Sequence, residues 1–222
     1  MAIPNRKLHI EPHDVRRRLD QLGLQEEWLK NAVQVGQLQR LNCTPHHPLS
    51  FPALSAWAET VKTLRDILVP EGFLIGNPRG LPIVFHQKRR ISLTVATGDE
   101  ATGREEFDPC TKSPKGPQTR SNISNNQLKL FPNEELAHAA YEQSIANTGY
   151  ITWLLLIHSD TQARELRCEL SLPIGMNEEG RVDGWEERII LGSTPFDADK
   201  LMVPTGETPQ SPNIIVNVKR RA

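Results

Sequence analysis

The sequence YITWLLLIH, residues 150–158, is the stretch that decides the fold. It is a continuous apolar run, without the alternation of apolar and polar side chains that is typical of a strand with one solvent-exposed face. Such a run predicts a strand that other elements cover on both faces. We therefore expect it to be the central strand of a sheet, with the core built around it.

The chain after this run supplies further strands. Residues 166–172 alternate between apolar and polar side chains, which predicts a half-buried strand antiparallel to the central one across a short connection. Residues 185–191 indicate another strand, and residues 214–218 a possible last one after a proline-rich surface crossing at 194–212. The polar face of the first of these strands carries Arg167, Glu169 and Ser171.

Residues 91–96 also alternate between apolar and polar side chains. Ile91, Leu93 and Val95 share one face of the predicted strand, which we expect to face the core. The opposite face is then left for solvent or a ligand. The preceding residues 82–86 are expected to pair with this strand, so that residues 87–90 form a turn with a basic tip.

The N-terminal part of the chain has the helical apolar period instead. After a polar arm, residues 1–13, this period predicts three helices within residues 14–72. Gly23 separates the first helix from the second, and Pro70 with Gly72 ends the third. The apolar positions that define the first helix are Val15, Leu19 and Leu22, and those of the third are Leu54, Trp57, Val61, Leu64 and Leu68.

These elements together predict an α+β fold. A three-helix N-terminal unit, residues 14–72, packs on a mainly antiparallel sheet of about five strands within residues 73–222. A fourth helix is expected at 132–147, just before the central strand, because Pro132 stands near its start and Gly149 after its end. A long loop at 98–128 has no apolar period.

Composition limits the compartment and the partners. The net charge of −1 and the pI of 6.7 exclude a field that would hold the whole molecule on nucleic acid or an anionic membrane, so such binding must be local. Three cysteines without a C-x-x-C pair fit a reducing cytosol. The N-terminus has no apolar signal segment and no run is long enough to span a bilayer, so we expect a soluble, cytoplasmic protein.

The loop at 98–128 carries the most suggestive polar residues. Its start, GDEATGR, has the spacing of a phosphate-binding loop, in which backbone amides and a lysine hold phosphate groups. Arg104 replaces the lysine, Glu105 replaces the hydroxyl residue that would hold magnesium, and no helix is expected directly after it. Nucleotide hydrolysis is therefore disfavoured.

The same loop offers a metal-dependent alternative. Asp99 and Glu100, joined by Glu169 from another strand, would hold Mg²⁺ or Mn²⁺ for attack on a phosphodiester, as in a nuclease. Against this, no lysine in the chain has a glutamate two positions before it, so the E-x-K of restriction-type nucleases is missing. An acidic turn that caps its own backbone is the favoured interpretation of Asp99.

Three weaker patterns are disfavoured as well. Cys43, His46 and His47 lack a nearby second cluster that would complete a zinc site. The pair Ser113 and Lys115 lacks the helical turn that aligns a Ser-Lys dyad. The two helices around Gly23 have the length of a helix-turn-helix, but acidic residues begin the second helix, where phosphate contacts belong.

The remaining hypothesis is binding through basic loops. Basic residues cluster in the turn at 87–90, in the loop at 98–128 and in the C-terminal tail. If these three clusters lie close together in the fold, their cations would bind phosphates in a salt-dependent way with little sequence specificity. Because no complete catalytic set is present, we expect a non-catalytic binding protein that contacts nucleic acid, a nucleoprotein complex or a protein partner. The candidate contact residues are Lys88, Arg89, Arg90, Lys112, Lys115 and Arg120, with a basic tail at 219–221.

Overall fold

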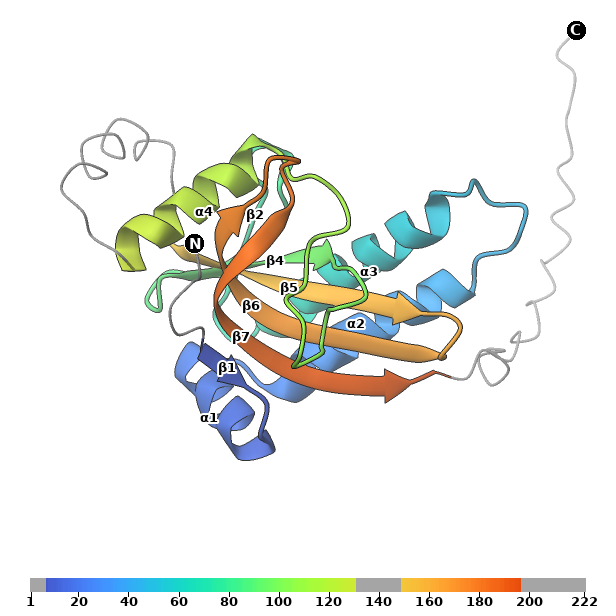
Figure 1. The fold of residues 1–222 in the computed structure, drawn as a ribbon, viewed down its shortest axis with the longest axis horizontal. Coiled ribbons are helices and arrows are strands. Elements are labelled where there is room, and N and C mark those ends of the chain that lie inside the picture. Colours follow the sequence, from blue (N-terminus) through green and yellow to red (C-terminus); the bar gives the residue numbers. More distant parts are fainter. Residues whose placement is uncertain (1–6, 131–148, 197–222) are drawn as a thin grey trace, which may run out of the picture.

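The apolar run at 150–158 forms strand β5 (Ile151–Asp160), which lies in the middle of a mixed sheet (Figure 1). The computed structural model describes residues 7–130 and 149–196, with side chains up to 127 in the first range. β5 pairs in parallel with β4 (Ile91–Thr97) and antiparallel with β6 (Glu165–Met176). Residues 152–156 are buried, which confirms the prediction of a strand covered on both faces.

The expected sheet of about five mainly antiparallel strands is wrong. The described residues form seven strands in a mixed sheet, in the order β1-β7-β6-β5-β4-β3-β2. β1 and β2 have three residues each, too few to show a period in sequence, and β1 lies within the segment that was expected to be a polar arm. The remaining bounds are β1 (Lys7–His9), β2 (Leu74–Gly76), the 3₁₀ turn η1 (Pro78–Gly80), β3 (Ile83–His86) and β7 (Val182–Pro195).

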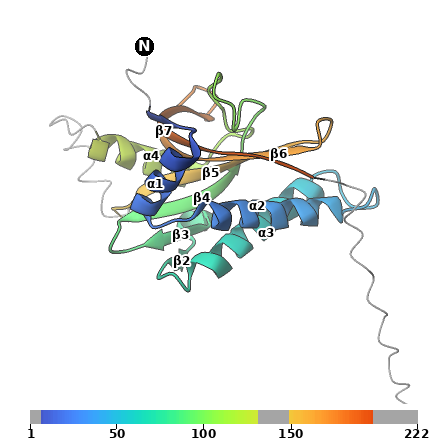
Figure 2. The same cartoon turned by 90° about the horizontal axis from the view of Figure 1, so that it is seen from below.

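Three N-terminal helices cover one face of the sheet, as the apolar period predicts (Figure 2). Val15, Leu19 and Leu22 are buried, and Gly23 ends the first helix with a φ of 72°, in the left-handed region that favours glycine. The stripe of the third helix is buried only in part, because Leu54 lies near its exposed start. The bounds are α1 (Pro12–Leu22), α2 (Glu26–Leu41) and α3 (Phe51–Leu68).

The opposite face is covered by α4 (Pro117–Leu130), by residues 98–116 and by a bent β6–β7 hairpin (Figure 1). The expectation that all of residues 98–128 are irregular is therefore wrong in its last part. The sequence did not predict α4 because its buried residues are polar apart from Ile123, so it has no apolar stripe. Asn126 is fully buried and bonds the backbone N–H and C=O of Thr152 and the carbonyl of Pro173.

Because this face of the sheet is covered, two predictions of a solvent-facing strand side are wrong. Ser92 and Thr94 of β4, and Glu169 and Ser171 of β6, are all buried, although their polar character predicted a solvent-facing side. The hairpin bends because its ladder is irregular beyond Leu172, where Gly175 opposes Gly184 at a separation that a side chain would not permit. Val182 and Trp185 thereby pack on the sheet with Ala96, Leu154 and Leu156.

The predicted helix at 132–147, the predicted strand at 214–218 and the basic tail at 219–221 lie outside the described residues. So does most of the proline-rich segment at 194–212. Within the part that is described, no helix is both long and apolar enough to cross a bilayer.

Candidate functional site

The loop at residues 98–116 is fixed over the carboxyl ends of β4 and β5. The Gly98 amide donates to the Ile157 carbonyl, and the Lys112 amide donates to the Thr97 carbonyl, each at 2.9 Å. On its far side the Thr111 amide donates to the carbonyl of Val182 in the bent hairpin, also at 2.9 Å. These bonds hold the loop in a fixed position between the sheet and the hairpin. The carboxyl ends of parallel strands are a common place for ligands to bind.

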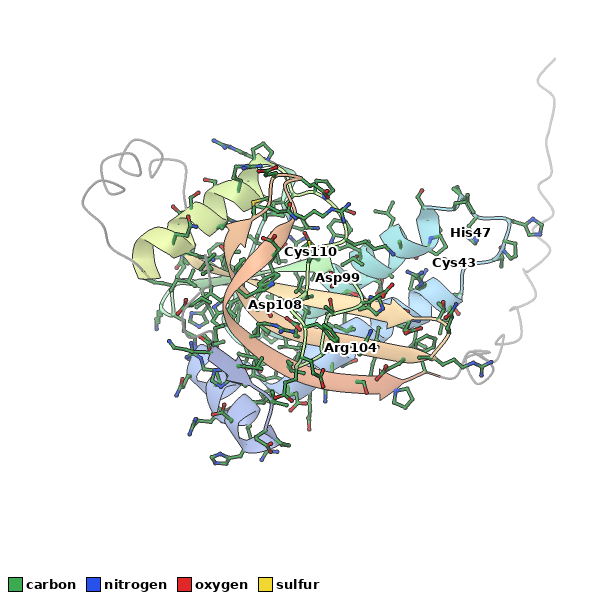
Figure 3. All side chains as sticks on the ribbon, in the orientation of Figure 1. Cys43, His47, Asp99, Arg104, Asp108 and Cys110 are labelled. Atoms are coloured by element: carbon green, nitrogen blue, oxygen red, sulfur yellow. The ribbon has the colours of Figure 1, made fainter. Side chains whose placement is uncertain are left out.

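Asp99 closes the loop on itself. One carboxylate oxygen accepts the Ala101 amide at 3.1 Å and the other accepts the Cys110 amide at 3.0 Å. The Asp99 amide returns a bond to the Cys110 carbonyl at 2.9 Å. This geometry agrees with the interpretation of Asp99 as an acid that caps its own turn. Figure 3 places Asp99 and Cys110 close together in this loop, over the sheet.

Beneath the loop lies a buried ion pair between Glu169 and Arg188. Arg188 Nε and Nη2 donate to the two carboxylate oxygens at 2.9 and 2.6 Å, and both side chains are 0% exposed. The carboxylate also accepts the Gly103 amide at 2.8 Å and the Ser171 hydroxyl at 2.6 Å. Arg188 further donates to the carbonyls of Arg104 and Phe107, so this pair supports the loop from below.

Arg188 was not among the site residues predicted from the sequence, although the sequence contains a pattern that could have indicated it. Glu169 and Arg188 both occupy polar positions of alternating strands, and two opposite charges on adjacent strands are able to pair. The pairing also bears on the metal hypothesis, because a carboxylate that already accepts four hydrogen bonds has little capacity left for a cation. Among the described residues, no three His, Cys, Asp or Glu side chains are placed to hold a metal ion together.

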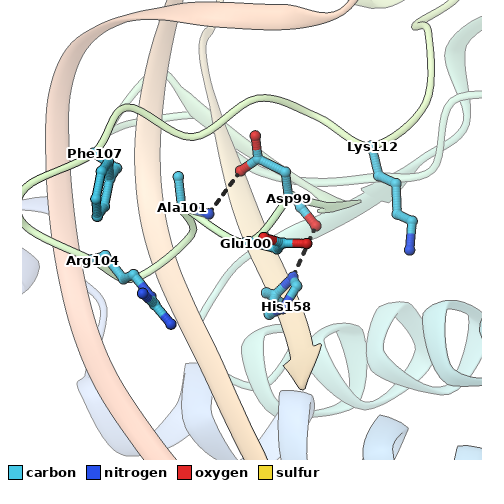
Figure 4. Close-up of a pocket in the computed structure, with 8 residues that line it drawn as sticks. Asp99, Glu100, Ala101, Arg104, Phe107, Lys112 and His158 are labelled. Atoms are coloured by element: carbon cyan, nitrogen blue, oxygen red, sulfur yellow. Dashed lines mark hydrogen bonds between the residues drawn. The ribbon is translucent and has the colours of Figure 1, made fainter. Parts of the chain in front are cut away.

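Above the sheet the loop borders an open cavity of about 500 Å³, here called the outer cavity (Figure 4). Arg104 and Lys112 line it, and neither side chain has a hydrogen bond or ion pair with another described residue. Phe107 also lines it, with 55% of the residue exposed. The other residues of its wall are Gly98, Asp99, Glu100, Ala101 and His158.

His158 forms the floor of the outer cavity, at the end of β5. Its Nδ1 lies 3.4 Å from the Gly98 carbonyl oxygen. Burial lowers the pKa of His158, and the nearby charge of Arg167 adds to this, while the Gly98 carbonyl acts in the opposite direction. The imidazole therefore carries less positive charge near pH 7 than an exposed histidine would. No sequence pattern pointed to it, because a histidine at the end of an apolar strand has no distinctive spacing.

The structure places the predicted basic residues in three separate regions. Lys88, Arg89 and Arg90 lie in the exposed turn at the amino end of β4, whereas Lys112 lies at its carboxyl end, roughly 20 Å away for a strand of this length. Arg89 approaches Gly23, and Arg90 donates to the Gly149 carbonyl at 3.0 Å. This turn therefore belongs to a different part of the surface.

Lys115 and Arg120 lie near the tip of the β6–β7 hairpin. The Lys115 amide donates to the Gly180 carbonyl at 2.8 Å, and the Arg120 guanidinium lies beside the same glycine. Burial lowers the pKa of the Lys115 amine. Of the six basic residues that the sequence predicted as contacts, Lys112 alone lines the outer cavity.

The weak zinc candidate lies elsewhere, at the connection between α2 and α3 (Figure 3). Cys43 donates to the Gln39 carbonyl, and the His47 ring stacks on Phe51, so both side chains have local structural roles. Comparison of the chain with protein-family models, with curated proteins and with solved structures gives no match. The function is therefore inferred from the geometry of the cavities.

Proposed function

We propose that this chain is a non-catalytic nucleic-acid-binding protein that holds a single-stranded segment in the outer cavity. The observation that carries the proposal is the presence, around one cavity, of an exposed aromatic ring and two cations that have no partner among the described residues. Arg104 and Lys112 would contact phosphates, and Phe107 would stack on a base. Stacking tolerates any base, so we expect little sequence preference.

The size of the cavity supports a nucleotide as the occupant. Its volume of about 500 Å³ falls within the range of pockets that hold ligands of this size. Glu100 also lines the cavity and would oppose polyanion binding, whereas the Asp99 carboxylate is already engaged by backbone amides. We therefore expect one or two phosphate contacts, with the logarithm of affinity falling by about 0.7 per phosphate for each tenfold rise in salt.

The test is a fluorescence anisotropy titration of labelled single-stranded DNA and RNA over a salt series, with EDTA present. Lys112→Ala and Phe107→Ala are each expected to weaken binding by roughly 5- to 100-fold, the range expected for loss of one stacked base or one phosphate contact. Lys88→Ala is the matched control, since it removes the same charge at the opposite end of β4. Its affinity is expected to equal that of the wild type.

Two results would overturn the proposal. Absence of salt-dependent binding would refute it, and so would an equal loss of affinity in Lys88→Ala and Lys112→Ala. A parallel series with Mg²⁺ or Mn²⁺ in place of EDTA addresses the metal-dependent alternative. Cleavage of the labelled strand that Asp99→Asn abolishes would replace the binding function with a phosphodiester-cleaving one.

A further inference from the structure

A second, smaller pocket of about 80 Å³ lies on the helical side of the sheet, here called the inner pocket. It is enclosed by α2, α3 and the carboxyl ends of β4 and β5, whose packing is visible in Figure 2. Gly98, Lys112 and His158 line both spaces, so the inner pocket adjoins the outer cavity. Its walls nevertheless have a different chemical character.

Two polar groups in the inner pocket have no partner among the described residues. Gln37 is only 5% exposed, and its Nε2 makes no hydrogen bond. The Ser159 hydroxyl is likewise buried without a partner. Neighbouring polar groups are satisfied, because Trp57 Nε1 donates to the Val95 carbonyl at 3.2 Å and the Thr60 hydroxyl to the Ala56 carbonyl at 2.8 Å. Buried donors without acceptors are unusual and need an explanation.

The charge of the inner pocket is positive. Arg40 and Lys112 line it, and neither side chain forms an ion pair with another described residue. No aspartate or glutamate is among its lining residues, whereas Asp99 and Glu100 both line the outer cavity. Two donors and two cations without a carboxylate are a chemical environment that favours an anionic acceptor.

The shape of the pocket restricts the anion. At Gly36 the helices α2 and α3 touch, because an added Cβ would lie 2.6 Å from the Ala56 carbonyl oxygen and 2.0 Å from the Thr60 hydroxyl. The volume of about 80 Å³ is small, so it suits a group of a few heavy atoms. Apolar side chains, among them Val33 and Ile157, complete the wall and suit an alkyl group rather than the polar faces of a phosphate.

We propose that the inner pocket binds the carboxylate of a small organic acid. Gln37 Nε2 and the Ser159 hydroxyl donate to the carboxylate oxygens, and Arg40 and Lys112 balance its charge. The short alkyl part contacts the apolar wall. The two sites share Lys112, but this one requires no nucleic acid in the outer cavity and is therefore tested in its absence.

Trp57 provides a direct reporter for the test. The chain has four tryptophans, and only Trp57 lines the inner pocket, so a ¹H–¹⁵N spectrum offers one indole signal at the site and three as internal controls. Titration with acetate and propionate is expected to shift the Trp57 indole signal with saturation at a Kd on the order of 1 mM, as suits so small a ligand. Acetamide and inorganic phosphate are the neutral and tetrahedral comparisons.

The decisive variant is Gln37→Leu, with Gln34→Leu as its matched control on the exposed face of the same helix. Gln37→Leu removes an unpaired buried amide, so it is expected to raise the melting temperature while it weakens acetate binding about five- to tenfold. Weaker binding in a more stable protein excludes unfolding as the cause. Gln34→Leu is expected to bind as the wild type does.

Three outcomes would overturn the proposal. One is a Trp57 signal that acetate and propionate leave unmoved at saturating concentration. Another is a Gln37→Leu variant that binds acetate as tightly as the wild type. The third is an equal response to acetamide or to inorganic phosphate, since it would remove the preference for a carboxylate.

Discussion

His158 is the residue at which the two candidate binding spaces meet. It lines both the outer cavity and the inner pocket, and it lies near the carboxyl end of β5. The pKa of His158 is lowered, chiefly because burial disfavours the imidazolium. A positive charge at this position would therefore arise only in acid, where it would change the charge of both spaces.

The lowered pKa predicts a loss of stability in mild acid. Above the unfolded-state pKa of about 6.5 the ring is neutral in both states. As the pH falls below this value the unfolded chain takes up the proton first, so the free energy of unfolding decreases until the pH passes the folded pKa. Urea denaturation at pH 7.5 and 5.5 measures the effect. The decrease should be smaller in His158→Gln, and an unchanged decrease would contradict the prediction.

At the scale of elements, the loop at 98–116 depends on two strands that are remote from it in sequence. The Glu169–Arg188 pair bonds an amide and two carbonyls of this loop, so its charges position the wall of the outer cavity. Because both side chains are fully buried, the loss of either one would leave the other charge buried without its partner and would destabilise the fold. The loop and the two strands therefore act as one structural unit.

Removal of one member of the buried pair should be costly. Glu169→Ala leaves the Arg188 guanidinium buried without its carboxylate, and the free energy of unfolding is expected to fall by about 3–5 kcal/mol. Glu165→Ala, in the same strand, removes a more exposed carboxylate 4.0 Å from Arg167 Nε and is expected to cost less than about 1 kcal/mol. Chemical denaturation of both variants measures the difference. Equal losses would show that the pair does not hold the loop.

At the scale of the whole molecule, the two faces of the sheet are stabilised differently. The helical face has a large apolar core that includes Trp153 and Leu155, to which all three N-terminal helices contribute. On the other face α4 contributes Ile123 to the smaller apolar cluster, and the rest of its contact is made by buried amide and hydroxyl groups. Since net hydrogen-bond energies are modest, α4 should separate from the sheet before the sheet itself unfolds.

Native-state hydrogen exchange tests this order. Asn126 accepts the Thr152 amide and holds β5 to α4, so Asn126→Ala should accelerate exchange at Thr152 by at least about tenfold. Ser124→Ala, which removes an exposed hydroxyl from the same helix, is the control and should leave that rate unchanged. The prediction fails if Thr152 exchanges equally slowly in both variants, or if α4 exchanges as slowly as β5.

The sequence by itself determined the central strand, the three N-terminal helices and the pairing of β3 with β4. These features follow from local apolar periods and turn residues, which depend only on neighbours in the chain. It also predicted that Asp99 caps its own turn, because an acid after a glycine at a strand end has backbone amides within reach.

Only the tertiary structure decided the rest. Short edge strands and the polar helix α4 have no apolar period, and their places depend on backbone pairing and buried amide bonds with distant residues. The same holds for the candidate sites. Gln37, Arg188 and His158 acquire their significance from burial against residues that are remote in sequence, and local spacing does not encode burial. Lys88 and Lys112 are likewise far apart because they lie at opposite ends of the extended strand β4.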